Sequence, residues 1–74
     1  MTLSKTDRIL ALINFYLPHD SLNQYHYEAD SIAYNTRKNS SLAAVEKLVR
    51  EYLGEYIQKE QLIRQLAEGI RSVL

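Results

Sequence analysis

The chain has 74 residues, with nine basic and nine acidic side chains, no cysteine, one proline and two glycines. A chain of this length is expected to form one domain, residues 1–74, around a small core. The missing cysteines exclude a disulfide scaffold and a thiolate zinc site. The balanced charge argues against the basic excess typical of proteins that bind a phosphate backbone, and the 46% hydrophobic content excludes a wholly disordered chain.

The first segment predicts a helix over residues 4–17. Ser4 followed by Asp7 is typical of a capping box, in which side chains satisfy the free amides of the first turn. Pro18 cannot continue the helical hydrogen bonds, so the helix ends there. The apolar run 9–17 is about half as long as a membrane span, and no cleavage pattern follows it. We therefore expect a soluble cytoplasmic protein, of bacterial or phage origin.

The second segment predicts a helix over residues 21–35, capped by Asp20 or Ser21. A strand here would have no partner elsewhere in the chain to satisfy its backbone. The apolar positions of the helix recur on one face: Leu22, Tyr25, Ala29, Ile32 and Ala33. Tyr25 and Tyr27 cannot both point inward from one helix, so at least one of them is expected to be exposed. Residues 35–40 are polar and predict a linker.

From residue 41 onward the apolar residues form a heptad seam, which fails once, at Lys59. Gly54 precedes this failure, and glycine inside a helix costs about 1 kcal/mol relative to alanine. Together they favour two helices, 41–53 and 58–73, joined near residues 54–57, over one long helix. The predicted fold is an all-α bundle of three to four helices, about 4–17, 21–35, 41–53 and 58–73.

The seam runs along the whole C-terminal half, and the N-terminal half offers little to cover it. Leaving such a stripe in water would expose an unusually large apolar patch. We therefore expect a homodimer whose interface includes seam residues from both helices. These residues are Val45, Val49, Tyr52, Tyr56, Ile63, Leu66 and Ile70.

No set of residues points to catalysis, so we expect neither an enzyme nor a bound cofactor. His19, His26 and Asp30 are candidate metal ligands, but their spacing matches no metal motif, and a solvated helix start explains them more simply. Ser40 and Ser41 precede a helix, where serines commonly cap. No metal site is expected.

The six tyrosines are unusual for this length, and tyrosine is enriched at protein interfaces. The leading hypothesis is a non-catalytic interaction module, a small regulator, adaptor or inhibitor that binds an unidentified protein. An alternative is a DNA-binding regulator in which helix 58–73 presents Lys59, Arg64 and Arg71 to the major groove. Five acidic residues balance the five basic ones from residue 41 onward, which weakens this alternative. A bacteriocin-immunity-type bundle, of comparable length and pattern, is a third hypothesis.

Overall fold

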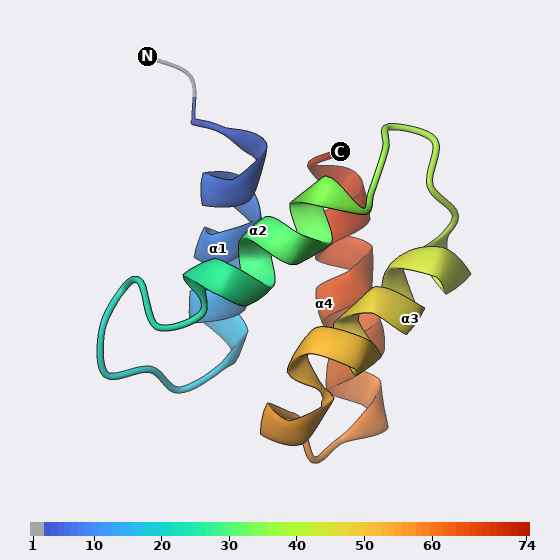
Figure 1. Ribbon diagram of the computed structural model, residues 1–74. Coiled ribbons are helices and arrows are strands. Elements are labelled where there is room, and N and C mark those ends of the chain that lie inside the picture. Colours follow the sequence, from blue (N-terminus) through green and yellow to red (C-terminus); the bar gives the residue numbers. More distant parts are fainter. Residues whose placement is uncertain (1–2) are drawn as a thin grey trace.

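The computed structural model describes residues 3–74, and all regular structure in this range is helical (Figure 1). The all-α prediction is therefore confirmed. In chain order the elements are α1 (Lys5–Tyr16), α2 (His26–Tyr34), α3 (Leu42–Leu53), the short 3-10 helix η1 (Gly54–Tyr56) and α4 (Glu60–Ser72).

Helix α1 has the start and the end that its sequence predicts. The Ser4 hydroxyl accepts a hydrogen bond from the backbone N–H of Asp7 at 3.0 Å, which satisfies one of the free amides of the first turn. Leu17, the residue before Pro18, is extended with φ −113° and ψ 143°. The helix buries Ile9, Leu10 and Ile13 against the rest of the chain.

Helix α2 begins at His26, so the prediction of a helix from residue 21 is wrong at its start. Neither Asp20 nor Ser21 caps it; the N-cap is Tyr25, which makes no side-chain capping bond. The Gln24 side chain instead accepts a hydrogen bond from the backbone N–H of Asp20 at 2.7 Å, and this bond holds the segment as a loop. Leu22 consequently lies in that loop with 71% of its surface exposed, and not on a buried helix face.

Helices α3 and α4 are separate, which confirms the two-helix prediction over a single long helix. The Ser41 hydroxyl caps α3 by accepting from the N–H of Ala44 at 3.1 Å. After η1 the backbone is extended at Ile57 and at Lys59, and the chain reverses direction there. The failed seam position at Lys59 thus lies immediately before α4.

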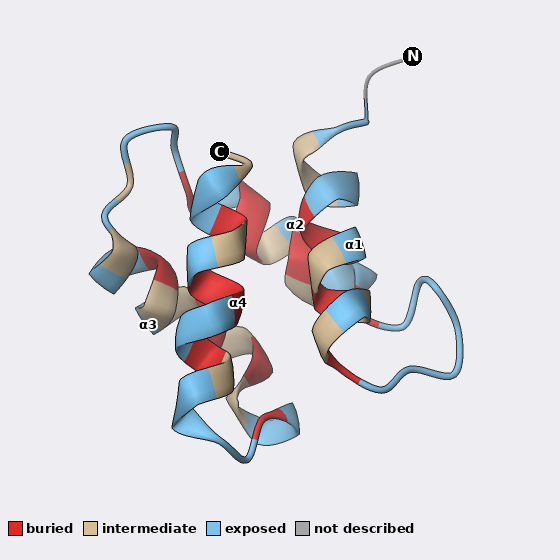
Figure 2. Cartoon of the chain, turned by 180° about the vertical axis from the view of Figure 1, so that it is seen from behind, coloured by how far each residue is buried: buried red, intermediate tan, exposed pale blue. Residues whose placement is uncertain are grey.

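The four helices form two hairpins, α1–α2 and α3–α4, and the hairpins pack on each other (Figure 1). Helix α1 contacts α4, and α2 contacts α3. The buried side of each helix faces the centre of the molecule (Figure 2). None of the helices in residues 3–74 has the length and apolarity that crossing a bilayer requires.

The C-terminal seam is covered within one chain, so the premise that the N-terminal half cannot shelter it is wrong. Val45, Val49, Leu66 and Ile70 are completely buried, and Ile63 is 5% exposed. The cover comes from α1, which contacts α4, and from α2, which contacts α3; buried residues of all four helices form one core. The homodimer prediction thereby loses the argument on which it rested.

Candidate functional site

The residues predicted to form an interface lie mostly in the core. Five of the seven, named above as buried, have almost no surface with which to contact another protein in this fold. Tyr52 is half-buried at the edge of the core, and Tyr56 is 43% exposed. The ring of Tyr56 packs edge-on against Tyr25, with centroids 5.4 Å apart, so it closes the rim of the core beside α2.

The predicted DNA-contacting residues are exposed, and one of them, Arg64, has an acidic partner. The Arg64 Nε lies 3.2 Å from the Glu68 Oε1, one turn along α4. Arg71 donates from Nε to the backbone carbonyl of Ser40 at 3.2 Å, which ties the end of α4 to the linker. Lys59 is the N-cap residue of α4, beside the Glu60 carboxylate that pairs with Arg50. The charges around these three residues therefore alternate in sign.

The histidine and aspartate candidates are directed to separate partners. The His19 ring nitrogen Nδ1 lies 3.2 Å from the carbonyl oxygen of Leu17, and Asp30 accepts a hydrogen bond from the Thr6 hydroxyl at 3.0 Å. Within residues 3–74, no three His, Asp or Glu side chains converge as metal ligands would. Ser41 acts as the expected helix cap, and Ser40 accepts from the N–H of Arg37 in the linker.

Several large hydrophobic side chains remain exposed, and they are concentrated in the N-terminal half. Tyr25 and Tyr27 divide as expected: Tyr25 is 3% exposed, whereas Tyr27 is 74% exposed. Tyr34 lies two turns further along the same side of α2 and is also exposed. Within residues 3–74 the set is Leu3, Phe15, Leu22, Tyr27, Tyr34 and Tyr56. Only Tyr56 belongs to the C-terminal half.

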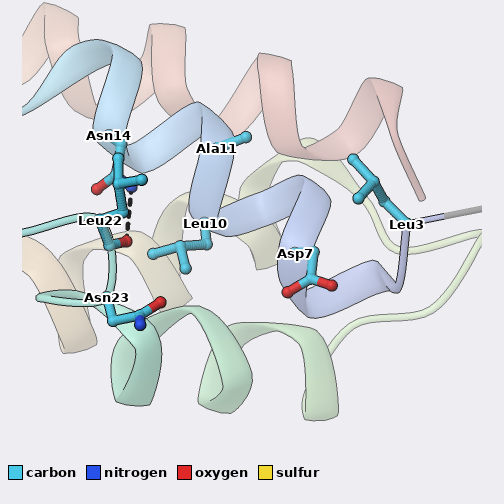
Figure 3. Close-up of a pocket in the computed structure, with 7 residues that line it drawn as sticks. All are labelled: Leu3, Asp7, Leu10, Ala11, Asn14, Leu22 and Asn23. Atoms are coloured by element: carbon cyan, nitrogen blue, oxygen red, sulfur yellow. Dashed lines mark hydrogen bonds between the residues drawn. The ribbon is translucent and has the colours of Figure 1, made fainter.

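An apolar hollow of about 410 Å³ lies along α1 (Figure 3). Four of its lining residues follow the spacing i, i+3, i+4, i+7 on one side of the helix, which places them in a continuous stripe. Loop residues preceding α2 border one end of the stripe, and Leu3 borders the other. The lining consists of Leu3, Asp7, Leu10, Ala11, Asn14, Leu22 and Asn23. The hollow is open to solvent along its length.

Asn14 fixes the wall of the hollow that the loop provides. Its Nδ2 donates to the backbone carbonyl of Leu22 at 2.8 Å, shown as the dashed line in Figure 3. This bond holds the exposed Leu22 beside α1. The Oδ1 of Asn14 is buried and receives no hydrogen bond from the residues that the structure describes. The amide therefore positions the loop through a single hydrogen bond from its nitrogen.

The edge of the hollow is acidic. Asp7 is the one charged residue that residues 3–74 contribute to its lining. The Thr6–Asp30 hydrogen bond places a second carboxylate at the same turn of α1. The ion pairs in residues 3–74 are Arg50–Glu60 and Arg64–Glu68, so neither aspartate has a basic partner in this range. We define the α1 groove as the hollow with Asp7 in its lining, together with Asp30, which lies outside the lining at the same turn of α1.

The α1 groove was not predicted from the sequence, because Leu22 was expected on the buried face of a helix and Leu10 belongs to the apolar run 9–17. Leu10 is indeed 7% exposed, but it forms the floor of a hollow that is open above it. A usable signal was present: Ala11, a small residue next to Leu10, leaves space on the outer side of the helix. The position of Leu22 had no such signal, because it depends on the loop that precedes α2.

Comparison with protein-family models, with curated proteins and with solved structures found no match to this chain.

Proposed function

We propose that this chain is a non-catalytic protein-interaction module, a small regulator, adaptor or inhibitor that acts by binding another protein through the α1 groove. The observation that carries the proposal is an open apolar hollow bordered by the exposed side chains of Leu3 and Leu22. Contiguous apolar surface with a polar rim is typical of protein-binding sites. The exposed aromatic side chains on the same half, Phe15 and Tyr27 among them, belong to the residue types enriched at such interfaces.

The shape of the groove favours a macromolecular partner over a small molecule. Its volume of about 410 Å³ falls in the range of small-ligand pockets. Such pockets, however, enclose roughly 70–90% of the ligand surface, whereas this hollow is open along α1. Its lining holds one carboxylate and two amides, without a nucleophile beside a base. These features support binding without catalysis.

Affinity capture with matched variants tests this proposal. Ala11→Arg fills the groove with a long side chain, and Ala43→Arg makes the same change at an exposed position of α3. Both replace an exposed alanine by a good helix former, so both variants are expected to fold. The tagged wild-type chain and Ala43→Arg should retain one partner protein from cells of the source organism, and that partner should bind the purified chain. Ala11→Arg should lose it.

Two results would contradict the proposal. One is that no captured protein is lost when Ala11 is replaced by arginine. The other is retention of the same partner by all three chains, which would place its contact surface elsewhere.

DNA binding through α4 is a second candidate, supported by the placement of Arg64 and Arg71 two turns apart on one exposed side of that helix. Glu68, paired with Arg64, reduces the positive potential there. A gel shift on duplex DNA at increasing salt separates the two candidates. Salt-sensitive binding that Arg64→Ala and Arg71→Ala together abolish would favour this alternative and count against the α1 groove.

A further inference from the structure

We infer that the α1 groove binds an amphipathic helix of the partner protein, with apolar side chains in the hollow and a lysine or arginine at the Asp7–Asp30 edge. The inference rests on the proposed function and specifies the partner that the groove accepts. Shape and charge each support it separately.

The shape of the groove fits a helix better than an extended segment. The stripe from Asp7 to Asn14 covers two turns, about 10 Å along α1, which matches apolar anchors spaced three or four residues apart on a partner helix. Strand addition requires an unpaired sheet edge, and residues 3–74 contain no strand. Polyproline segments dock between aromatic side chains, and no aromatic residue lines this hollow.

The charge of the groove selects a basic partner. Among the described residues, the lining contains Asp7 and no basic side chain. Asp30 lies at the same turn through its bond with Thr6. The nearby Lys5 is directed elsewhere, since its ammonium donates to the carbonyl of Thr36. Arg8 follows Asp7 in the chain; like Asp30 it lies outside the lining, and it forms no ion pair with Asp7. Electrostatic complementarity of this kind mainly determines which partner binds.

The loop before α2 is a fixed wall in this interaction. Asn14 holds the carbonyl of Leu22, so the Leu22 side chain stands beside the hollow as an exposed apolar border. A partner helix lying on Leu10 and Ala11 would contact Leu22 at one end and Leu3 at the other. A bound helix would therefore cover Leu3 and Leu22, two of the most exposed leucines of the chain. The contact would then bury apolar surface outside the hollow as well as inside it.

Two synthetic helical peptides of about 14 residues, or four turns, test the inference on the full chain. Both carry leucines at helical spacing; one has lysines flanking the leucine stripe, and the other has glutamates at the same positions. Fluorescence anisotropy measures their affinities, and amide chemical shifts of the isotope-labelled protein locate the contact. The lysine peptide should bind about tenfold more tightly or better, and it should shift the amides of Leu10, Ala11 and Asn14.

Variants separate the apolar contribution from the charged one. Ala11→Arg should abolish binding of the lysine peptide, and Ala43→Arg should leave it unchanged. The double change Asp7→Asn with Asp30→Asn keeps side-chain size and should bring the two affinities within about threefold of each other, because the charge preference is lost while the hollow remains.

The inference is overturned if neither peptide binds, if the glutamate peptide binds as tightly as the lysine peptide, or if the shifts map outside the α1 groove. It is also overturned if the chain alone forms a dimer in which these same amides shift with concentration, since a second copy would then be the occupant. Capture of a partner that depends on position 11, combined with any of these results, would leave the proposed function standing without this inference. If no captured partner depends on position 11 and neither peptide binds, the proposed function and this inference are both contradicted.

Discussion

Tyr25 and Tyr27 show how two identical residues, two positions apart, take opposite roles. The Tyr25 hydroxyl donates to the carbonyl of Pro18, and its ring packs on Tyr56. Tyr27 points into solvent. The sequence predicted that at least one of the two would be exposed, because residues two positions apart point to different sides of a helix. The apolar pattern placed Tyr25 on the buried face of the predicted helix, and the structure buries it. It does so at the N-cap of α2, through contacts with Pro18 and Tyr56 that the pattern did not predict.

We expect Tyr25→Ala to reduce the free energy of unfolding by about 3–5 kcal/mol, as deletion of a buried aromatic ring usually does. Tyr25→Phe keeps the ring and loses one hydrogen bond, so it should cost about 1 kcal/mol. Tyr27→Ala serves as the control and should change the stability by less than about 0.5 kcal/mol. Denaturant unfolding followed by circular dichroism measures all three. Equal effects of Tyr25→Ala and Tyr27→Ala would show that the burial assignment is wrong.

The Arg50–Glu60 pair gives a pH-dependent signature at the residue scale. Arg50 hydrogen-bonds the carboxylate and lowers the pKa of Glu60. A carboxyl group whose pKa is depressed in the folded state stabilises the fold above its usual value, and this contribution is lost as the pH falls through the depressed pKa. Wild type should therefore exceed Glu60→Gln in stability at neutral pH, and the difference should vanish well below the usual pKa of about 4.5.

Both side chains of this pair are largely exposed, so the effect should be small and should weaken with added salt. Thermal unfolding of wild type and Glu60→Gln across acidic and neutral pH, at low and high salt, is the measurement. A stability difference that persists in acid would contradict the assignment of the effect to the ionised carboxylate.

At the scale of the elements, the helix ends set by local chemistry were predictable and the one set by tertiary contacts was not. Ser4, Ser41 and Pro18 act through bonds within a few residues, and the helices begin or end beside them as expected. The failed seam position at Lys59 located the gap before α4. The start of α2 was misplaced because Asp20 and Ser21 are good capping residues in isolation, whereas the buried Tyr25 and the Gln24–Asp20 bond hold that segment as a loop.

Gly54 gives a test of the α3–α4 joint. It has right-handed helical backbone angles, φ −56° and ψ −34°, and a methyl group added there would meet no atom within 4 Å. Glycine is thus not required by the turn, and Gly54→Ala should stabilise the protein by about 0.4–1 kcal/mol by restricting the unfolded chain. Equilibrium unfolding measures this change. A clear destabilisation would indicate that the residue takes the left-handed conformation and that the joint differs from the one described.

At the scale of the whole molecule, the periodic pattern identified the buried stripe but not what covers it. A heptad seam buries equally well against helices of its own chain or of a second chain. Here α1 and α2 of the same chain cover the seam. The four helices have nine to thirteen residues each and pair as two hairpins, α1–α2 and α3–α4. The α1 groove, in contrast, was predictable only on its α1 side, where Ala11 leaves space, because its other wall is a loop whose position follows from the fold.

Leu66 is a seam residue that tests whether the seam is covered within one chain. Leu66→Ala removes a completely buried side chain and should cost about 2–5 kcal/mol. Because the seam is covered within one chain, the melting temperatures of wild type and variant should not depend on protein concentration, as they would for a dimer that shields the seam. Calorimetry over a wide concentration range checks this. A melting temperature that rises steadily with concentration would show that a second copy stabilises the fold.

Thiol labelling tests most directly whether the seam is internal and the α1 groove is open. The chain has no cysteine of its own, so single substitutions report one position each: Ala67→Cys on the buried side of α4, Ala11→Cys in the groove, and Ala43→Cys as an exposed reference. We expect Ala11→Cys to react with a maleimide as fast as Ala43→Cys, and Ala67→Cys to react far more slowly at every protein concentration. Fast labelling of Ala67→Cys in dilute solution, slowing as the protein is concentrated, would contradict the account.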